Sequence, residues 1–174
     1  MSNLSSALVI EKDRPTRILI VEDDPQMAKF ISFKLGYLGY EVAGIASNES
    51  MAIELAKELH PDLILMDIRI KGEMDGIEAA QVIRNSFGIP VIFSTAYLDE
   101  KRIERAKITM PFGYVLKPIQ ERDLKVTIEM ALYVAKVDVE RRKAEDRYKG
   151  LVNIMNSGVA VYQVINDGRS GSDY

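Results

Sequence analysis

The chain has 174 residues, 47% of them hydrophobic and 28% charged, with a formal net charge of -3. This length and apolar content suit one full domain and part of another, and the slight acidity argues against electrostatic binding of nucleic acid or an anionic membrane. No Cys and a single His exclude disulfides, thiol catalysis and sites that need two imidazoles. No apolar run approaches a membrane span of roughly 20 residues and no signal peptide is evident, so we expect a cytoplasmic protein.

Short apolar segments alternate with helical patterns along most of the chain. Residues 1–14 show no clear period, and we expect a flexible lead-in there. Beyond them, strands are predicted at residues 17–21, 40–46, 63–66, 90–94 and 113–116, and the apolar runs at 17–21 and 63–66 indicate buried strands. Helical spacing of apolar residues follows each strand, weakly at 98–108, and a fifth helix begins after Pro118.

Five strands that alternate with five helices predict one α/β domain over residues 15–135. Buried strands joined by helices imply a doubly wound parallel sheet with right-handed crossovers. In a flavodoxin-like strand order, 2-1-3-4-5, the first, third and fourth strands are neighbours. Their carboxyl ends then form one crevice, which is where open parallel sheets bind ligands.

The C-terminal part differs in composition and predicts one long helix. Ile128, Leu132, Ala135 and Val139 are spaced as in a coiled-coil seam, which predicts a homodimer through this helix and its extension. The alternative is a solitary helix that packs these residues on its own domain. We expect a helical, coiled-coil-like linker at 136–152, a break at 153–158 and a strand at 159–165.

Polar side chains stand at the carboxyl ends of the predicted strands. Glu22 and Asp23 follow the first strand, Asp67 the third, Thr95 the fourth and Lys117 the fifth. Carboxylates this close repel one another unless a cation compensates, and oxygen ligands without His or Cys suit Mg²⁺. Asp67 could then attack phosphorus, while Lys117 and Thr95 contact the phosphoryl oxygens.

Taken singly, such residues have ordinary explanations. Asp24 is expected to cap a helix, Lys117 alone would be a solvated strand end, and His60 is expected in a surface loop. The combination of the acidic residues, the hydroxyl and the lysine at one edge is what favours phosphoryl chemistry.

Five motifs occur in order, and together they resemble the receiver domain of two-component response regulators. They are Ile18-Leu-Ile-Val-Glu-Asp-Asp24, Pro61-Asp-Leu-Ile-Leu-Met-Asp-Ile68, Met74-Asp-Gly76, Pro90-Val-Ile-Phe-Ser-Thr-Ala96 and Gly113-Tyr-Val-Leu-Lys-Pro118. The resemblance implies a signalling switch that takes a phosphoryl group from a histidine kinase or histidine phosphotransfer protein. Such a domain catalyses its own phosphorylation and dephosphorylation and is not a turnover enzyme on an external substrate.

The resemblance also implies a magnesium site around the phosphoacceptor. Asp67 falls on the phosphoacceptor position, Asp23 on a direct metal ligand and Glu22 on a ligand through water. The backbone carbonyl of Arg69 is implied as a further ligand. Lys117 falls on the family's lysine, with a cis peptide bond to the proline that comes after it.

Other matching positions concern signalling and phosphoryl lifetime. Thr95 and Tyr114 fall on the switch pair, and the Ala96 amide is implied to contact the phosphoryl group. Arg69 and Tyr97 lie where the family tunes hydrolysis, and their bulk predicts slow autodephosphorylation. The loop after Asp67 departs from the family, since it lacks the usual proline and is one residue longer before the helix.

The last part of the chain resembles the beginning of a PAS sensor domain, from residues 144–152 and 156–161. We therefore expect residues 153–174 to be the truncated start of such a domain, because a lone strand cannot form a stable unit. The alternative is a helix with an irregular tail.

Other function classes fit less well. A haloacid-dehalogenase-type phosphatase wants an Asp where Arg69 stands, and no Gly-rich loop ends in Gly-Lys-Ser/Thr for nucleotide hydrolysis. A DNA-binding regulator would need a basic recognition helix, which is not seen here. A non-phosphorylated receiver-like interaction module stays as the alternative, although its acidic site would normally be eroded.

Overall fold

The computed structural model describes residues 14–96 and 112–166, with side chains as far as residue 153. In chain order the elements are β1 (Arg17–Val21), α1 (Pro25–Tyr37), β2 (Glu41–Ala46), α2 (Glu49–Leu59), β3 (Leu63–Asp67), α3 (Gly76–Phe87), β4 (Val91–Thr95), β5 (Gly113–Leu116) and α5 (Glu121–Asn166). The helix predicted at 98–108 and almost all of the lead-in lie outside the described residues.

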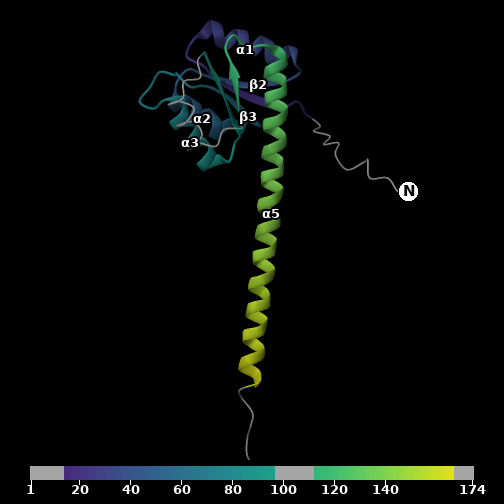
Figure 1. Ribbon diagram of the computed structural model, residues 1–174. Coiled ribbons are helices and arrows are strands. Elements are labelled where there is room, and N and C mark those ends of the chain that lie inside the picture. The colour runs from purple at the N-terminus through teal and green to yellow at the C-terminus, as the bar shows by residue number, and fades with distance from the viewer. Residues whose placement is uncertain (1–13, 97–111, 167–174) are drawn as a thin grey trace, which may run out of the picture. The chain divides into compact units, whose positions relative to one another are not determined.

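The five strands form one parallel sheet in the order β2-β1-β3-β4-β5. This confirms the predicted doubly wound, flavodoxin-like α/β sheet and the long C-terminal helix. Helices α2 and α3 lie on one face, and α1 and the first turns of α5 lie on the other (Figure 1).

Successive side chains of the strands contribute alternately to two separate apolar cores, one on each face of the sheet. Ile18 and Ile20 of β1 pack toward α1 and α5, whereas Leu19 and Val21 pack toward α2 and α3. Successive residues of a strand point to opposite faces, so a strand buried on both sides needs the continuous apolar run seen here.

The register of the sheet brings the polar strand ends to one level. Val21 pairs with Met66, and Asp67, one residue further, pairs with Ser94. Because all strands are parallel, the residues after β1, β3 and β5 leave the sheet at the same edge.

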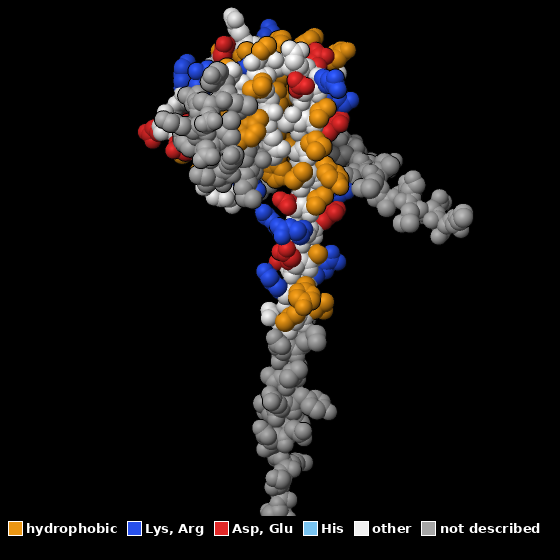
Figure 2. Space-filling view, in the orientation of Figure 1, with side chains coloured by type: hydrophobic (Ala, Val, Ile, Leu, Met, Phe, Trp, Pro, Cys, Tyr) orange, Lys and Arg blue, Asp and Glu red, His pale blue; other side chains and the backbone are white. Residues whose placement is uncertain are grey.

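The first part of α5 belongs to the core of the sheet domain. Ile128 is fully buried, and Leu132 packs against the same apolar cluster. The prediction that the N-terminal half of the coiled-coil seam, Ile128 and Leu132, contacts a partner chain is therefore wrong. The alternative, in which these two residues pack on their own domain, is confirmed for them. Val126 and Val139 are instead about half exposed, and hydrophobic side chains are visible along α5 (Figure 2).

Helix α5 also continues further than predicted. The expected break at 153–158 and strand at 159–165 are wrong, because the helix runs without interruption to Asn166. Single Gly, Ser and Asn residues cost a helix only about 0.5–1 kcal/mol each. A β-branched run becomes a strand only when a neighbouring strand satisfies its backbone, and none is described beside it.

The described chain divides into two compact units between Val134 and Ala135. Among the described residues, none of the helices combines the length and the apolar character that crossing a membrane requires.

Replacing Ile128 by Ala should lower the free energy of unfolding by about 2–5 kcal/mol, because it opens a cavity between α5 and the sheet. The matched change Val126→Ala, at a half-exposed position on the same helix, should change it by less than about 0.5 kcal/mol. Urea unfolding measures both. Equal effects would show that Ile128 is not part of the core.

Candidate functional site

One ammonium group joins two buried carboxylates at the carboxyl edge of the sheet. Lys117 Nζ, just after β5, lies 2.7 Å from Glu22 Oε2 and 2.6 Å from Asp67 Oδ2. Glu22 is 3% exposed and Asp67 7%. The geometry brings together three of the residues that the sequence placed at this edge.

The backbone around Asp67 holds its carboxylate in place. The amide of Arg69 donates to Asp67 Oδ1 at 2.9 Å, so each carboxylate oxygen has a partner. Gly76, the first residue of α3, donates its N–H to Ile68 O at 3.1 Å. A Cβ at Gly76 would overlap the Asp67 carbonyl, and only glycine therefore fits there.

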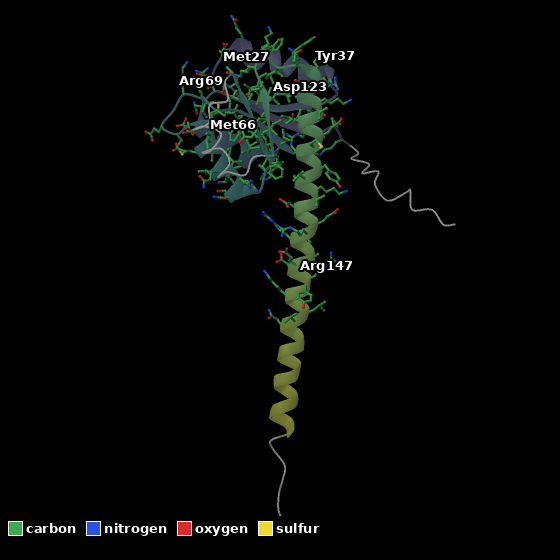
Figure 3. All side chains as sticks on the ribbon, viewed as in Figure 1. Met27, Tyr37, Met66, Arg69, Asp123 and Arg147 are labelled. Carbon is green, nitrogen blue, oxygen red and sulfur yellow. The ribbon has the colours of Figure 1, made fainter. Side chains whose placement is uncertain are left out.

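Asp23 completes an acidic cluster. One oxygen from each of Glu22, Asp23 and Asp67 lies within 4.8 Å of the others. These residues line a pocket of about 400 Å³ with Asp24, Met27, Arg69 and Lys117. Met27 comes from α1 and Arg69 from the loop after β3 (Figure 3). Clustered carboxylate oxygens are the donors that a hard divalent cation such as Mg²⁺ prefers.

The electrostatics of the pair follow from burial. Burial raises the pKa of Glu22, and the hydrogen bond from Lys117 only partly offsets this rise. Burial alone would lower the pKa of Lys117, but its hydrogen bonds to Asp67 and Glu22 outweigh that effect and raise it. The lysine therefore stays charged, and its ammonium offsets the negative charge of the two carboxylates.

Thr95 and Ala96 stand at the end of β4, which is the strand next to the one that carries Asp67. Thr95, the last residue of β4, is 2% exposed, and its carbonyl accepts the backbone N–H of Lys117 at 2.9 Å. Ala96 follows it and is exposed. The peptide bond between Lys117 and Pro118 is cis, as the resemblance implied. Tyr97 lies outside the described residues.

Tyr114 of β5 is partly buried against Phe93, with ring centroids 5.9 Å apart. Its hydroxyl is buried and has no hydrogen-bond partner among the described residues. Burial raises the pKa of this phenol, so it stays protonated at neutral pH.

The sequence did not identify Lys71 and Gly76 as part of the site, whereas the structure confirms the helix-capping role that was predicted for Asp24. Asp24 caps α1 by accepting the N–H of Gln26 at 2.8 Å, as expected. Lys71, in the loop after β3, lies 3.3 Å from Asp23 Oδ2, and no local pattern marked it. Gly76 stood in a quoted motif, but its close approach to Asp67 follows only from the tertiary structure.

Comparison with known proteins agrees with this geometry. Residues 18–129 match the family described as the response regulator receiver domain. The transcriptional regulatory protein PdtaR of Mycobacterium tuberculosis is 33% identical over 151 residues, covering 79% of this chain and 73% of PdtaR.

Two solved receiver structures are also similar. The signal receiver domain of a modulated diguanylate cyclase from Desulfovibrio desulfuricans is 37% identical, with a TM-score of 0.68, over 71% of this chain and 98% of that domain. The N-terminal domain of a response regulator/sensory box/GGDEF three-domain protein from Carboxydothermus hydrogenoformans is 38% identical, with a TM-score of 0.65, over 71% and 99%.

Replacing Lys117 by Met should lower the free energy of unfolding by about 3–5 kcal/mol, because two buried carboxylates lose their cation. The loss should shrink as the pH falls and Glu22, whose pKa is raised by burial, becomes protonated. The exposed Lys125, whose Nζ lies 3.9 Å from Glu129 Oε1, provides the control Lys125→Met, with an effect below about 1 kcal/mol. Urea unfolding over a pH series measures this, and equal losses for both variants would contradict it.

Proposed function

Because this chain belongs to the response regulator receiver domain family, we propose that it is a phosphorylation switch whose phosphoacceptor is Asp67. The observation that carries the proposal is the position of Lys117 Nζ, 2.6 Å from Asp67 and 2.7 Å from Glu22. A nucleophilic carboxylate with a fixed cation beside it suits phosphoryl transfer, in which negative charge must be stabilised.

The donor is a phosphorylated histidine of a histidine kinase or a histidine phosphotransfer protein. An Asp67 oxygen attacks phosphorus, the P–O bond forms, and the P–N bond to the donor imidazole breaks. Lys117 neutralises charge on the transferring group. The Thr95 hydroxyl and the Ala96 amide contact its oxygens.

The acidic cluster is proposed to bind Mg²⁺ through Glu22, Asp23 and Asp67, with the Arg69 backbone carbonyl as a further ligand. The carboxylate oxygens within 4.8 Å of one another support this donor set. When bound, the ion would offset negative charge between the incoming phosphoryl group and the carboxylates. The side chains of Arg69 and Tyr97 are proposed to screen water and slow hydrolysis.

The signal is proposed to pass from Thr95 and Tyr114 to α5 and then to a downstream domain. The unpartnered hydroxyl of Tyr114 supports a second position for that side chain. The Carboxydothermus relative is the N-terminal domain of a three-domain protein, which supports a receiver that acts on a neighbouring C-terminal domain. The start of a PAS-like domain at 153–174, after a helical linker at 136–152, stays part of this proposal, with a helical rather than a stranded beginning because α5 continues to Asn166.

Incubation with acetyl phosphate and Mg²⁺ should add the mass of one phosphoryl group to the protein, measured by intact mass spectrometry. Asp67→Asn should abolish the adduct, and Lys117→Ala should reduce it strongly, because the developing charge loses its cation. The exposed carboxylate of Asp123 provides the control Asp123→Asn, which should keep the adduct. An unmodified wild-type protein would favour the alternative, a non-phosphorylated interaction module.

A homodimer through α5 is also proposed, with the pairing residues beyond the core of the sheet domain. Ala135 and Val139 keep the seam spacing, and Val139 is 48% exposed. Val139→Glu should shift the molar mass measured by light scattering from dimer to monomer. Val126→Glu, on the same helix outside this seam, should not. A dimer that survives Val139→Glu would contradict this seam.

A further inference from the structure

The loop between β3 and α3 is fastened to the start of α2. Lys71 forms an isolated parallel β-bridge with Asn48, the N-cap of α2. The backbone N–H of Glu73 donates to Glu49 Oε1 at 2.8 Å. Glu49 is only 5% exposed although it is charged, so its carboxylate is committed to this contact. The two contacts flank one residue, Gly72.

Gly72 shows how closely the loop approaches this carboxylate. Its φ of +147° lies in the region that favours glycine, and a Cβ would overlap the carboxylate of Glu49. The second oxygen, Oε2, is buried without a hydrogen-bond partner among the described residues. The backbone hydrogen bond from Glu73 lowers the pKa of Glu49, which keeps the carboxylate ionised at neutral pH.

These contacts with the start of α2 place the side chain of Lys71 beside the acidic cluster. Lys71 Nζ lies 3.3 Å from Asp23 Oδ2. The lysine side chain is 83% exposed, whereas that of Asp23 is 21% exposed. Asp23 is one of the three residues whose oxygens gather within 4.8 Å. The ammonium therefore lies against the same carboxylate that a divalent cation would need. The loop that carries this ammonium is held by residues of α2 and its N-cap, which are not members of the cluster.

We propose that the ammonium of Lys71 competes with a divalent cation for the carboxylate of Asp23. In this proposal Glu49 is the positioning residue that keeps Lys71 beside Asp23. The inference rests on the proposed function for the metal site but adds a residue that sets its affinity. A divalent ion must displace Lys71 from Asp23 and accept a nearby positive charge. Because Lys71 is exposed, the displacement is easy, and the lysine weakens metal binding without preventing it.

The direct test is calorimetric titration of the whole chain with MgCl₂ at constant ionic strength. An exposed ion pair contributes up to about 1 kcal/mol, so Lys71→Ala should lower the Kd for Mg²⁺ by about two- to fivefold. Lys71→Arg keeps the charge and should bind as the wild type does. Lys57→Ala removes the same charge at the far end of α2 and should leave the Kd unchanged.

A second pair of variants tests the positioning role. Glu49→Ala and Gly72→Ala, each checked for folding by circular dichroism, should release the loop and lower the Kd for Mg²⁺ in the same direction as Lys71→Ala. In the Lys71→Ala background, Glu49→Ala should have no further effect, because the residue it positions is gone. If Glu49→Ala lowers the Kd for Mg²⁺ in the Lys71→Ala background as much as it does in the wild type, the positioning role of Glu49 is overturned.

The outcomes separate this inference from the proposed function. If the wild type and Lys71→Ala bind Mg²⁺ with the same Kd, the inference is overturned. The proposed function is not affected by that result, because it is tested separately by the phosphoryl adduct on Asp67. If neither protein binds Mg²⁺, the inference and the proposed metal site fail together. A lower Kd for Lys71→Ala alone, with Lys57→Ala unchanged, supports the competition.

Discussion

The ammonium of Lys117 lies between two carboxylates that come from distant parts of the chain, Glu22 after β1 and Asp67 at the end of β3. Both acids are almost fully buried, and together they would repel strongly without it. The lysine therefore offsets the repulsion between the two buried acidic side chains at this edge of the sheet. The parallel sheet makes the contact possible, because it brings three strand ends to the same level.

The charge balance of this edge agrees with the proposed metal ion and the proposed phosphoryl group. Three carboxylates, from Glu22, Asp23 and Asp67, meet the two ammonium groups of Lys71 and Lys117 among the described residues. The excess of negative charge supports the proposed cation, and the fixed lysine supports the proposed phosphoryl group. The two lysines differ in burial, so one is a permanent part of the site and the other is exchangeable.

Local patterns predicted the centre of the sheet correctly because β1, β3 and β4, which are buried on both faces, are continuously apolar. The same reasoning was wrong for the N-terminal half of the α5 seam, where a heptad spacing fits equally well to a partner helix or to the domain's own sheet. Burial of Ile128 decided between the two for this half. Residues 159–165 looked like a strand from their β-branched content, but strand formation depends on a neighbour, and the helix continues instead.

By itself, the sequence determined which residues stand at the carboxyl ends of the strands, because strand length and motif order are local properties. Asp67, Thr95 and Lys117 were placed there on that basis. Only the tertiary structure decided that Lys71 lies against Asp23 and that Glu49 fastens the loop beside it. These contacts join segments with no shared periodicity, and an irregular loop takes its path from the surfaces it packs against rather than from its own residues.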